Sequence, residues 1–254
     1  MLPVYITIRE KVEEQLDYND FFQLETRILK AKSDWYSNEV RSSLLDVIQK
    51  FKHTAPISNI VCIGLGTLHQ SSLEGGRSLA QHIVAYTLAE ELTRMYKEEG
   101  IALQEPITIV AQDPAYTGRD LTFLSDLPVP IRIEANPGGF LSINAQSLVF
   151  SSFPVVPVKQ IIADLARESP DGKGPAALFM NNNHRDKLWG DFDIIRIPRD
   201  SPSYYANPET RGYVETLQSY EQIMDGKRLF GAADPADGPD YDWLSGMDIW
   251  AREE

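Results

Sequence analysis

The eight residues Ile60-Val61-Cys62-Ile63-Gly64-Leu65-Gly66-Thr67 decide the fold of this chain. Four consecutive apolar residues, three of them β-branched, predict a strand that is buried on both faces. The two glycines that follow allow a tight turn and a close approach of the backbone to a ligand. The stretch therefore predicts a parallel strand of an α/β sheet, with a loop at its carboxyl end that can hold a ligand.

Working outward from this strand, helix and strand periodicities alternate along the chain. A helix capped by Ser37 or Asn38 is expected before it, and a long helix that stops at Gly100 is expected after it. Further strands are expected over 107–111, 131–133, 147–153 and 176–180, with an edge strand over 191–198. Further helices are expected over 119–127, 158–167 and 213–224, and Asn207-Pro208 should open the last of these. This order predicts an α/β, Rossmann-like three-layer sandwich with a mostly parallel sheet.

The chain divides into three expected parts. Residues 1–55 form an N-terminal helical segment, residues 56–200 the Rossmann-like core, and residues 201–254 a C-terminal helix followed by an acidic tail. Trp243 and Trp250 lie in that tail. Two interpretations stay open: the tail docks on its own domain, or it binds a protein partner.

Composition excludes several classes of function. The 254 residues include 24 Lys and Arg against 37 Asp and Glu, a net charge of −13 that disfavours nonspecific binding to nucleic acid or to anionic membranes. No apolar run is long enough for a membrane span, and the first residues do not have the pattern of a signal peptide. The one cysteine, Cys62, excludes an internal disulfide. We therefore expect an intracellular protein, cytoplasmic or nuclear.

Polar and small residues follow the predicted strands where a parallel sheet binds its ligands, outside the carboxyl ends. The cofactor-binding candidates lie after the first three strands of the core, and they are Gly64, Gly66, Thr67, Asp113 and Asn136. The candidates for a catalytic side chain are His184, Asn181 and His69. Asp113 either accepts hydrogen bonds from a ribose or caps a turn before Pro114.

Several catalytic and cofactor motifs are absent or incomplete. The turn after Ile63 lacks the third glycine of a dinucleotide fingerprint, and no Gly-Lys-Ser/Thr follows it, which excludes a P-loop. No Gly-x-Ser-x-Gly elbow is present, and the four histidines and one cysteine lack zinc-ligand spacing. The glycine turn is thus either a ligand loop or only a tight connection, and we expect no metal site.

The same motifs resemble a known family. Residues 60–67 are similar to the hydrophobic-Cys-x-Gly-Leu-Gly-Ser/Thr opening of the SRR1-like domain (sensitivity to red light reduced), and Gln112-Asp113-Pro114-Ala115-Tyr116 resembles its later Asp-Pro element. The helix that starts at Ser78 is similar to the segment between them. Residues 139–165 resemble the fungal branch of the family. The resemblance covers about residues 56–185.

One segment departs from the family. Plant and animal members carry Phe-x-Met-Pro-His-Cys where this chain has Phe179-Met180-Asn181-Asn182-Asn183-His184. The proline and the cysteine are missing here, so a role tied to that cysteine has no counterpart in this chain. The resemblance implies a regulatory protein, linked to circadian and light signalling and to regulation of haem biosynthesis. It implies no general catalytic mechanism.

Three functions follow as hypotheses. The first is a regulatory protein with a small-molecule or nucleotide-type pocket at the carboxyl edge of the sheet. The second is an enzyme that uses S-adenosylmethionine or NAD(P), with Gly64 and Gly66 under the cofactor and Asp113 on its ribose. The third is a scaffold that binds a protein through the C-terminal tail. Haem is a further candidate ligand, with His69 and His184 as axial ligands.

Overall fold

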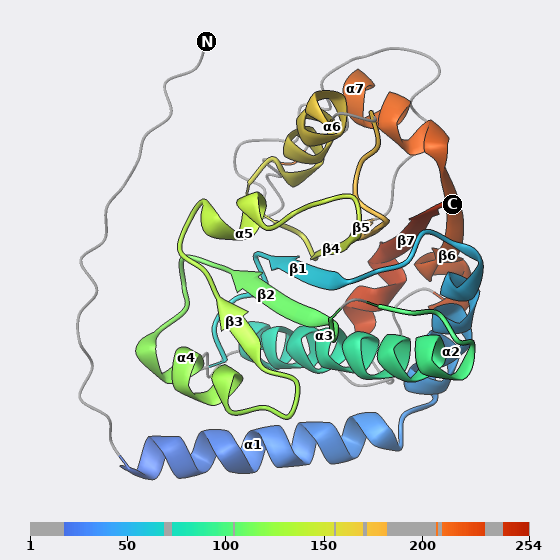
Figure 1. Ribbon diagram of the computed structural model, residues 1–254. Coiled ribbons are helices and arrows are strands. Elements are labelled where there is room, and N and C mark those ends of the chain that lie inside the picture. The colour runs from blue at the N-terminus through green and yellow to red at the C-terminus, as the bar shows by residue number, and fades with distance from the viewer. Residues whose placement is uncertain are drawn as a thin grey trace.

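The structure, a computed structural model, describes residues 18–68, 73–103, 105–154, 156–169, 172–181, 207, 210–231 and 241–253 (Figure 1). Over these residues the chain forms a seven-stranded sheet of order β3-β2-β1-β4-β5-β7-β6. The strands are β1 (Asn59–Ile63), β2 (Thr108–Gln112), β3 (Ile131–Ile133), β4 (Ser147–Ser151), β5 (Ala177–Asn181), β6 (Tyr220–Asp225) and β7 (Met247–Arg252). β1 to β5 pair in parallel, and β7 runs antiparallel to both of its neighbours.

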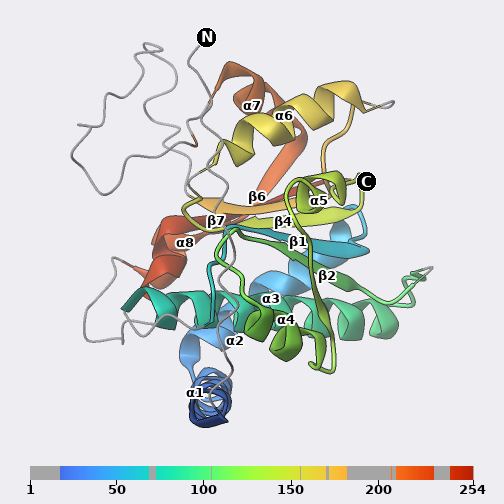
Figure 2. The same cartoon turned by 90° about the vertical axis from the view of Figure 1, so that its left-hand side faces the viewer.

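Helices cover both faces of the sheet, and α1 forms an outer layer against α3 (Figure 2). The helices are α1 (Tyr18–Tyr36), α2 (Glu39–Ile48), α3 (Leu73–Glu98), α4 (Gly118–Ser125), α5 (Gly138–Leu141), α6 (Val158–Glu168), α7 (Arg211–Thr216) and α8 (Gly226–Phe230), with short 3-10 helices η1 (Gln49–His53), η3 (Leu217–Ser219) and η5 (Asp242–Gly246). The prediction of an α/β three-layer sandwich with a mostly parallel sheet, an N-terminal helical segment and a C-terminal extension is confirmed.

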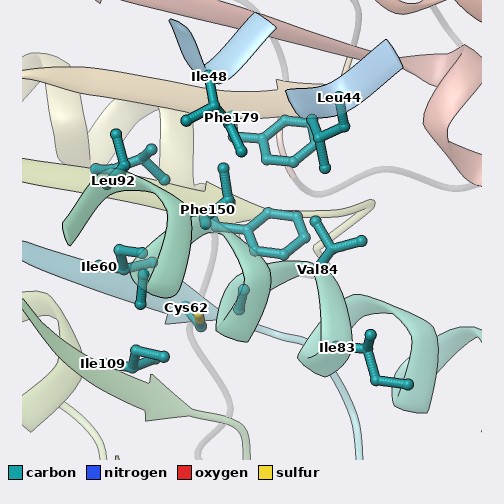
Figure 3. Close-up of a cluster of buried hydrophobic side chains, with 14 of the residues drawn as sticks. Leu44, Ile48, Ile60, Cys62, Ile83, Val84, Leu92, Ile109, Phe150 and Phe179 are labelled. Carbon is teal, nitrogen blue, oxygen red and sulfur yellow. The ribbon is translucent and has the colours of Figure 1, made fainter. Parts of the chain in front are cut away.

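Alternate residues of the central strands point into two separate cores, which explains why those strands read as continuous apolar runs. On one face, Ile60 and Cys62 of β1 pack with Phe150 of β4 beneath α2 and α3 (Figure 3). On the other face, Val61 and Ile63 pack beneath α6 and α7. The stacked rings of Phe150 and Phe179, 4.6 Å apart, join β4 to β5.

The local signals for helix ends act as the sequence predicts. The Asn38 side chain accepts a hydrogen bond from the Val40 amide and caps α2. Gly100 follows α3 with a φ of +70°, the left-handed conformation that favours glycine at a helix end. The edge strand predicted over 191–198 lies outside the described residues.

The helix predicted over 213–224 is wrong. Helix α7 and the 3-10 turn η3 end by Ser219, and β6 begins at Tyr220. Pairing with β7 overrides the helical periodicity, because Tyr220, Ile223 and Met224 are buried against the sheet. Asn207 does not open this helix either: its side chain accepts a hydrogen bond from the Lys159 amide and so caps α6.

The C-terminal residues form part of the sheet, which composition did not predict. β7 lies between β5 and β6, and Trp250 within it is 2% exposed. Trp243 in η5 is also buried, against the rings of Phe150 and Phe179. Both tryptophans therefore dock on the chain's own domain, as the first interpretation of the tail expects.

The contact of α8 with β7 generates a stability prediction. A Cβ on Gly226 would overlap the backbone carbonyl oxygens of Met247 and Leu244, so Gly226→Ala must displace the start of β7. Overpacking of this kind should lower Tm by about 5–10 °C, measured by circular dichroism. Gly118→Ala is the control, because nothing lies near the added Cβ. Equal Tm values for the two variants would contradict the placement of β7 against α8.

Candidate functional site

The loops after β1 and β2 meet at the carboxyl edge of the sheet. Gly64 and Gly66 have φ values of +77° and +79°, which L side chains rarely adopt. The Gly64 amide donates to the Gln112 carbonyl oxygen over 2.9 Å, which extends the β1–β2 pairing into the turn. The glycines thus serve the backbone geometry predicted for them.

Asp113 joins the two loops through its carboxylate. The Gly66 amide donates to Oδ2 of Asp113 over 2.8 Å, and the Ala115 amide donates to Oδ1 over 2.7 Å. The bond from the Ala115 amide is the turn cap predicted as one role of Asp113, and the bond from the Gly66 amide ties Asp113 to the glycine turn. A carboxylate can accept about four hydrogen bonds, so the half-buried Asp113 side chain can still accept further hydrogen bonds from a ligand.

A second aspartate, Asp120, fixes the same loops from inside. Its carboxylate is completely buried and accepts hydrogen bonds from the Thr67 hydroxyl (2.9 Å), the Leu68 amide (2.8 Å), and the amide (2.7 Å) and hydroxyl (2.8 Å) of Thr117. Thr67 is therefore held as a link between loops. Thr117 and Asp120 also form a capping box at the start of α4.

The loop after β3 reaches the edge through Gln112. The side-chain oxygen of Gln112 accepts a hydrogen bond from the Gly139 amide over 2.8 Å, and its side-chain nitrogen donates one to Oδ1 of Asn136 over 3.4 Å. A Cβ on Gly139 would lie 2.6 Å from that of Gln112, so α5 approaches the edge only because residue 139 is glycine. Asn136 itself is exposed, and Glu134 beside it pairs with Arg132 over 3.1 Å.

The ends of β4 and β5 complete the edge. The Ser151 hydroxyl donates to the Ile63 carbonyl oxygen over 2.8 Å, which ties β4 to the end of β1. Asn181 accepts a hydrogen bond from the Phe153 amide over 2.9 Å through its side-chain oxygen. The structure therefore gives Asn181 a positioning contact at the edge.

Two buried hydroxyls near this edge lack a hydrogen-bond partner among the described residues. The Ser78 side chain in α3 is 4% exposed and that of Ser152, just after β4, is 5% exposed. Ser78 Oγ lies 3.3 Å from the position that a Cβ on Gly66 would occupy. Buried polar groups are normally paired, so each hydroxyl has capacity for a bound molecule.

Beneath the glycine loop, His82 and Tyr116 form a buried pair that the sequence did not single out. His82 Nδ1 lies 2.7 Å from the Ser78 carbonyl oxygen, so Nδ1 donates and Nε2 accepts from the Tyr116 hydroxyl, 2.8 Å away. Burial lowers the pKa of His82 and raises that of Tyr116 well above its ordinary value. Both side chains are therefore neutral near pH 7.

The structure brings together Gly64, Gly66, Thr67, Asp113 and Asn136 at one edge, with Asn181 at the neighbouring strand end. His69 and His184 lie outside the described residues. Sequence reasoning missed the role of Asp120, for which the Thr-x-x-Asp capping pattern was the available signal. It also missed Phe153, whose backbone conformation has no sequence signal.

Two cavities among the described residues lie beside α1, and neither is lined by any of the five cofactor-binding candidates. One, of about 30 Å³, is bounded by Trp35, His82 and Tyr86 and holds little more than water. The other, of about 170 Å³, is bounded by Arg27, Lys30 and Tyr241. At the carboxyl edge, Gly64, Asp113 and Glu134 are all partly exposed.

This geometry defines a Rossmann-like α/β protein with a candidate small-molecule site at the carboxyl edge of its sheet. The family model of the SRR1 domain matches residues 29–218, and the chain belongs to that family. The match ends before β6 and β7. Searches of curated proteins and of solved structures found no match.

Two properties of the described ranges bear on the site. Each helix there is too short or too polar to cross a lipid bilayer. No group of three or more His, Cys, Asp or Glu side chains in these ranges is arranged to hold a metal ion.

Removal of the Asp120 carboxylate should destabilise the protein more than any exposed substitution on α4. Asp120→Ala removes a completely buried acceptor of four hydrogen bonds, and we expect unfolding to become easier by about 3 kcal/mol or more, measured by urea denaturation. Asp126→Ala at the exposed end of the same helix is the matched control. A loss of equal size in both variants would contradict the proposed fastening of the loops.

The buried His82 should make stability depend on pH. An unfolded histidine takes up a proton as the pH falls through about 6.5, whereas folded His82 resists protonation because burial lowers its pKa. Tm should therefore fall from pH 7.5 to 5.5, and His82→Gln should flatten this slope. His53→Gln, which replaces an exposed histidine at the end of η1, is the control substitution. Parallel profiles for wild type and His82→Gln would contradict the assignment.

Proposed function

We propose that this SRR1-domain protein binds an adenosine-containing cofactor of the S-adenosylmethionine class at the carboxyl edge of its sheet. The observation that carries the proposal is the contact of Gly66 in the β1 loop with Asp113 at the end of β2. These are the two positions at which nucleotide-binding α/β folds place the glycine turn and the ribose acceptor. The regulatory role implied by the family would then be exerted through this ligand.

The sheet topology favours S-adenosylmethionine over a nicotinamide dinucleotide. Dinucleotide-binding sheets have the order 3-2-1-4-5-6, whereas here an antiparallel β7 is inserted between β5 and β6. That inserted antiparallel strand is typical of S-adenosylmethionine-dependent methyltransferases of class I. Because a fold is only an analogy, the support must also come from the site.

The polar groups at the edge fit an adenosine cofactor. Asp113 keeps acceptor capacity for a ribose diol, and the positive-φ turn at Gly64 and Gly66 brings backbone close to a ligand. The hydroxyl of Ser78, which has no hydrogen-bond partner among the described residues, could bond the amino acid part of the same molecule. These residues would hold the group, and the cofactor would supply an electrophilic methyl when bound.

Charge also favours a ligand without phosphates. Asp113 and Glu134 put two carboxylates at the edge, and α3 begins only at Leu73, several residues beyond Gly66. A pyrophosphate would thus meet like charge and would not find a helix N-terminus directly after the glycine turn. S-adenosylmethionine carries a sulfonium and an ammonium group, which two carboxylates favour.

Methyl transfer is the second candidate function, and the inserted antiparallel strand favours it. The regulatory interpretation covers the family's links to circadian and light signalling and to haem biosynthesis, and regulation of that pathway does not require haem binding. Trp243 and Trp250 are buried, which favours a structural role for the C-terminal residues over capture of a partner.

Calorimetry and thermal shift with S-adenosylhomocysteine, S-adenosylmethionine, NAD, NADP, ATP and haem test the proposal. At about 100 times its dissociation constant, S-adenosylhomocysteine should raise Tm by roughly 5–10 °C. Asp113→Asn should weaken its binding at least about tenfold, and exposed Asp126→Asn should not. A shift with NAD but not with S-adenosylhomocysteine, or equal affinity in Asp113→Asn that is folded by circular dichroism, would overturn it.

The same titration separates the two candidate functions. With S-adenosylmethionine and a protein-free cell extract as the source of acceptors, an enzyme should accumulate S-adenosylhomocysteine, and Asp113→Asn should slow this accumulation. A regulatory protein should bind S-adenosylmethionine without consuming it.

A further inference from the structure

Phe153 is the one non-glycine residue with a positive φ among the described residues, at +48°. That conformation is a genuine outlier for a bulky side chain, and it persists only where the surroundings enforce it. Here the Phe153 amide donates to Oδ1 of Asn181, at the end of the neighbouring strand β5. The ring is nevertheless 40% exposed, so the strained backbone does not serve to bury it.

Phe153 lies just beyond the carboxyl end of β4, beside the point at which the strand order of the sheet reverses. β1 and β4 are neighbours at which the strand order reverses, and open α/β sheets bind ligands outside the carboxyl ends at such a switch point. Ser151 is bonded to the Ile63 carbonyl oxygen, and a Cβ on Gly64 would lie 3.7 Å from the Cβ of Pro154. Phe153 is therefore held at a fixed place beside the glycine turn.

Ser152 gives an independent indication of a ligand at the same point. Its hydroxyl is buried, it directly precedes Phe153, and it has no hydrogen-bond partner among the described residues. An unpaired buried hydroxyl costs stability unless a bound molecule or water completes it. An exposed ring on a strained backbone and a buried hydroxyl that no described residue pairs with are thus adjacent in sequence at the switch point.

We propose that Phe153 and Ser152 form a second small-molecule subsite, which takes a planar heteroaromatic ring that is neutral or cationic. The ring would stack on Phe153, and the nitrogen of a neutral ring would also accept a hydrogen bond from the Ser152 hydroxyl. Asp113 and Glu134 at the same edge disfavour an anion, while the negative face of the Phe153 ring attracts a cation. The inference rests on the proposed function only in assigning the neighbouring glycine turn to the cofactor.

Three probes that share two fused six-membered aromatic rings and differ in charge test the subsite: quinoline, 1-methylquinolinium and 2-naphthalenesulfonate. Their dissociation constants are measured by NMR titration of the full chain, with and without S-adenosylhomocysteine. The cationic and neutral rings should bind and the anionic ring should bind at least about tenfold more weakly. Phe153→Gly should weaken the two binders about tenfold or more, while Phe153→Trp retains them.

The glycine variant separates function from folding. Glycine adopts a φ of +48° without strain, so Phe153→Gly should keep the Tm of the wild type or raise it by a few degrees. Affinity for S-adenosylhomocysteine should change by less than about twofold. Leu141→Ala, which removes an apolar side chain that is 79% exposed on α5, is the control and should affect neither probe binding nor Tm.

The outcomes distinguish the two proposals. Ring binding that is lost in Phe153→Gly supports the subsite even when the wild type does not bind S-adenosylhomocysteine, and in that case only the proposed function fails. Ring binding that is equal in wild type and Phe153→Gly, no ring binding by the wild type, or preference for the sulfonate overturns the subsite. A large fall in the Tm of Phe153→Gly also overturns it, because the ring would then serve packing.

Discussion

One buried carboxylate, that of Asp120, holds the two loops from which the candidate site is built. Four donors, from Thr67, Leu68 and Thr117, converge on it at the point where the β1 loop passes the start of α4. A completely buried charge is tolerable only with such full pairing. Because the partners come from both loops, any rearrangement of either would leave that charge unpaired. Asp113 can therefore hold a fixed position at the edge with a single bond to the β1 loop.

The sequence predicted the central half of the sheet well and its far side poorly, for a physical reason. β1, β2, β4 and β5 are buried on both faces, so each is visible as a local apolar run between turn signals. β6 and β7 are defined by each other and by β5, pairings between segments that are distant along the chain. The helical spacing of residues 213–224 is a local signal that this long-range pairing overrides. Asn207 is another example, since it caps a helix that starts 49 residues earlier, at Val158.

At the candidate site, the sequence could predict which residues lie together at the sheet edge, but not which hydrogen bonds they make. The rule that parallel strands end at one edge was enough to bring Gly66, Asp113 and Asn136 together. It could not tell that Thr67 would turn inward to Asp120, because that contact joins residues 53 apart in sequence. Nor could it identify Phe153, because a residue type that disfavours positive φ gives no sign that it adopts one. What the sequence cannot reveal here is which polar groups are already paired within the protein.

That distinction divides the edge into two halves with different physical characters. On the β1–β2 half, the carboxylates of Asp113 and Asp120 are bonded to backbone, so the loops are ordered before any ligand arrives and little conformational entropy remains to be lost on binding. On the β1–β4 half, the Ser152 hydroxyl has no hydrogen-bond partner within the described ranges and Phe153 is strained, so this half is less stable than it would be with an ordinary side chain arrangement. A fold that needed only stability would have relieved both features, for instance with glycine at 153 and alanine at 152. Their presence beside a rigid, well-paired neighbour favours a ligand-binding role for the β4 end of the edge, with the ordered half fixing where that ligand must lie.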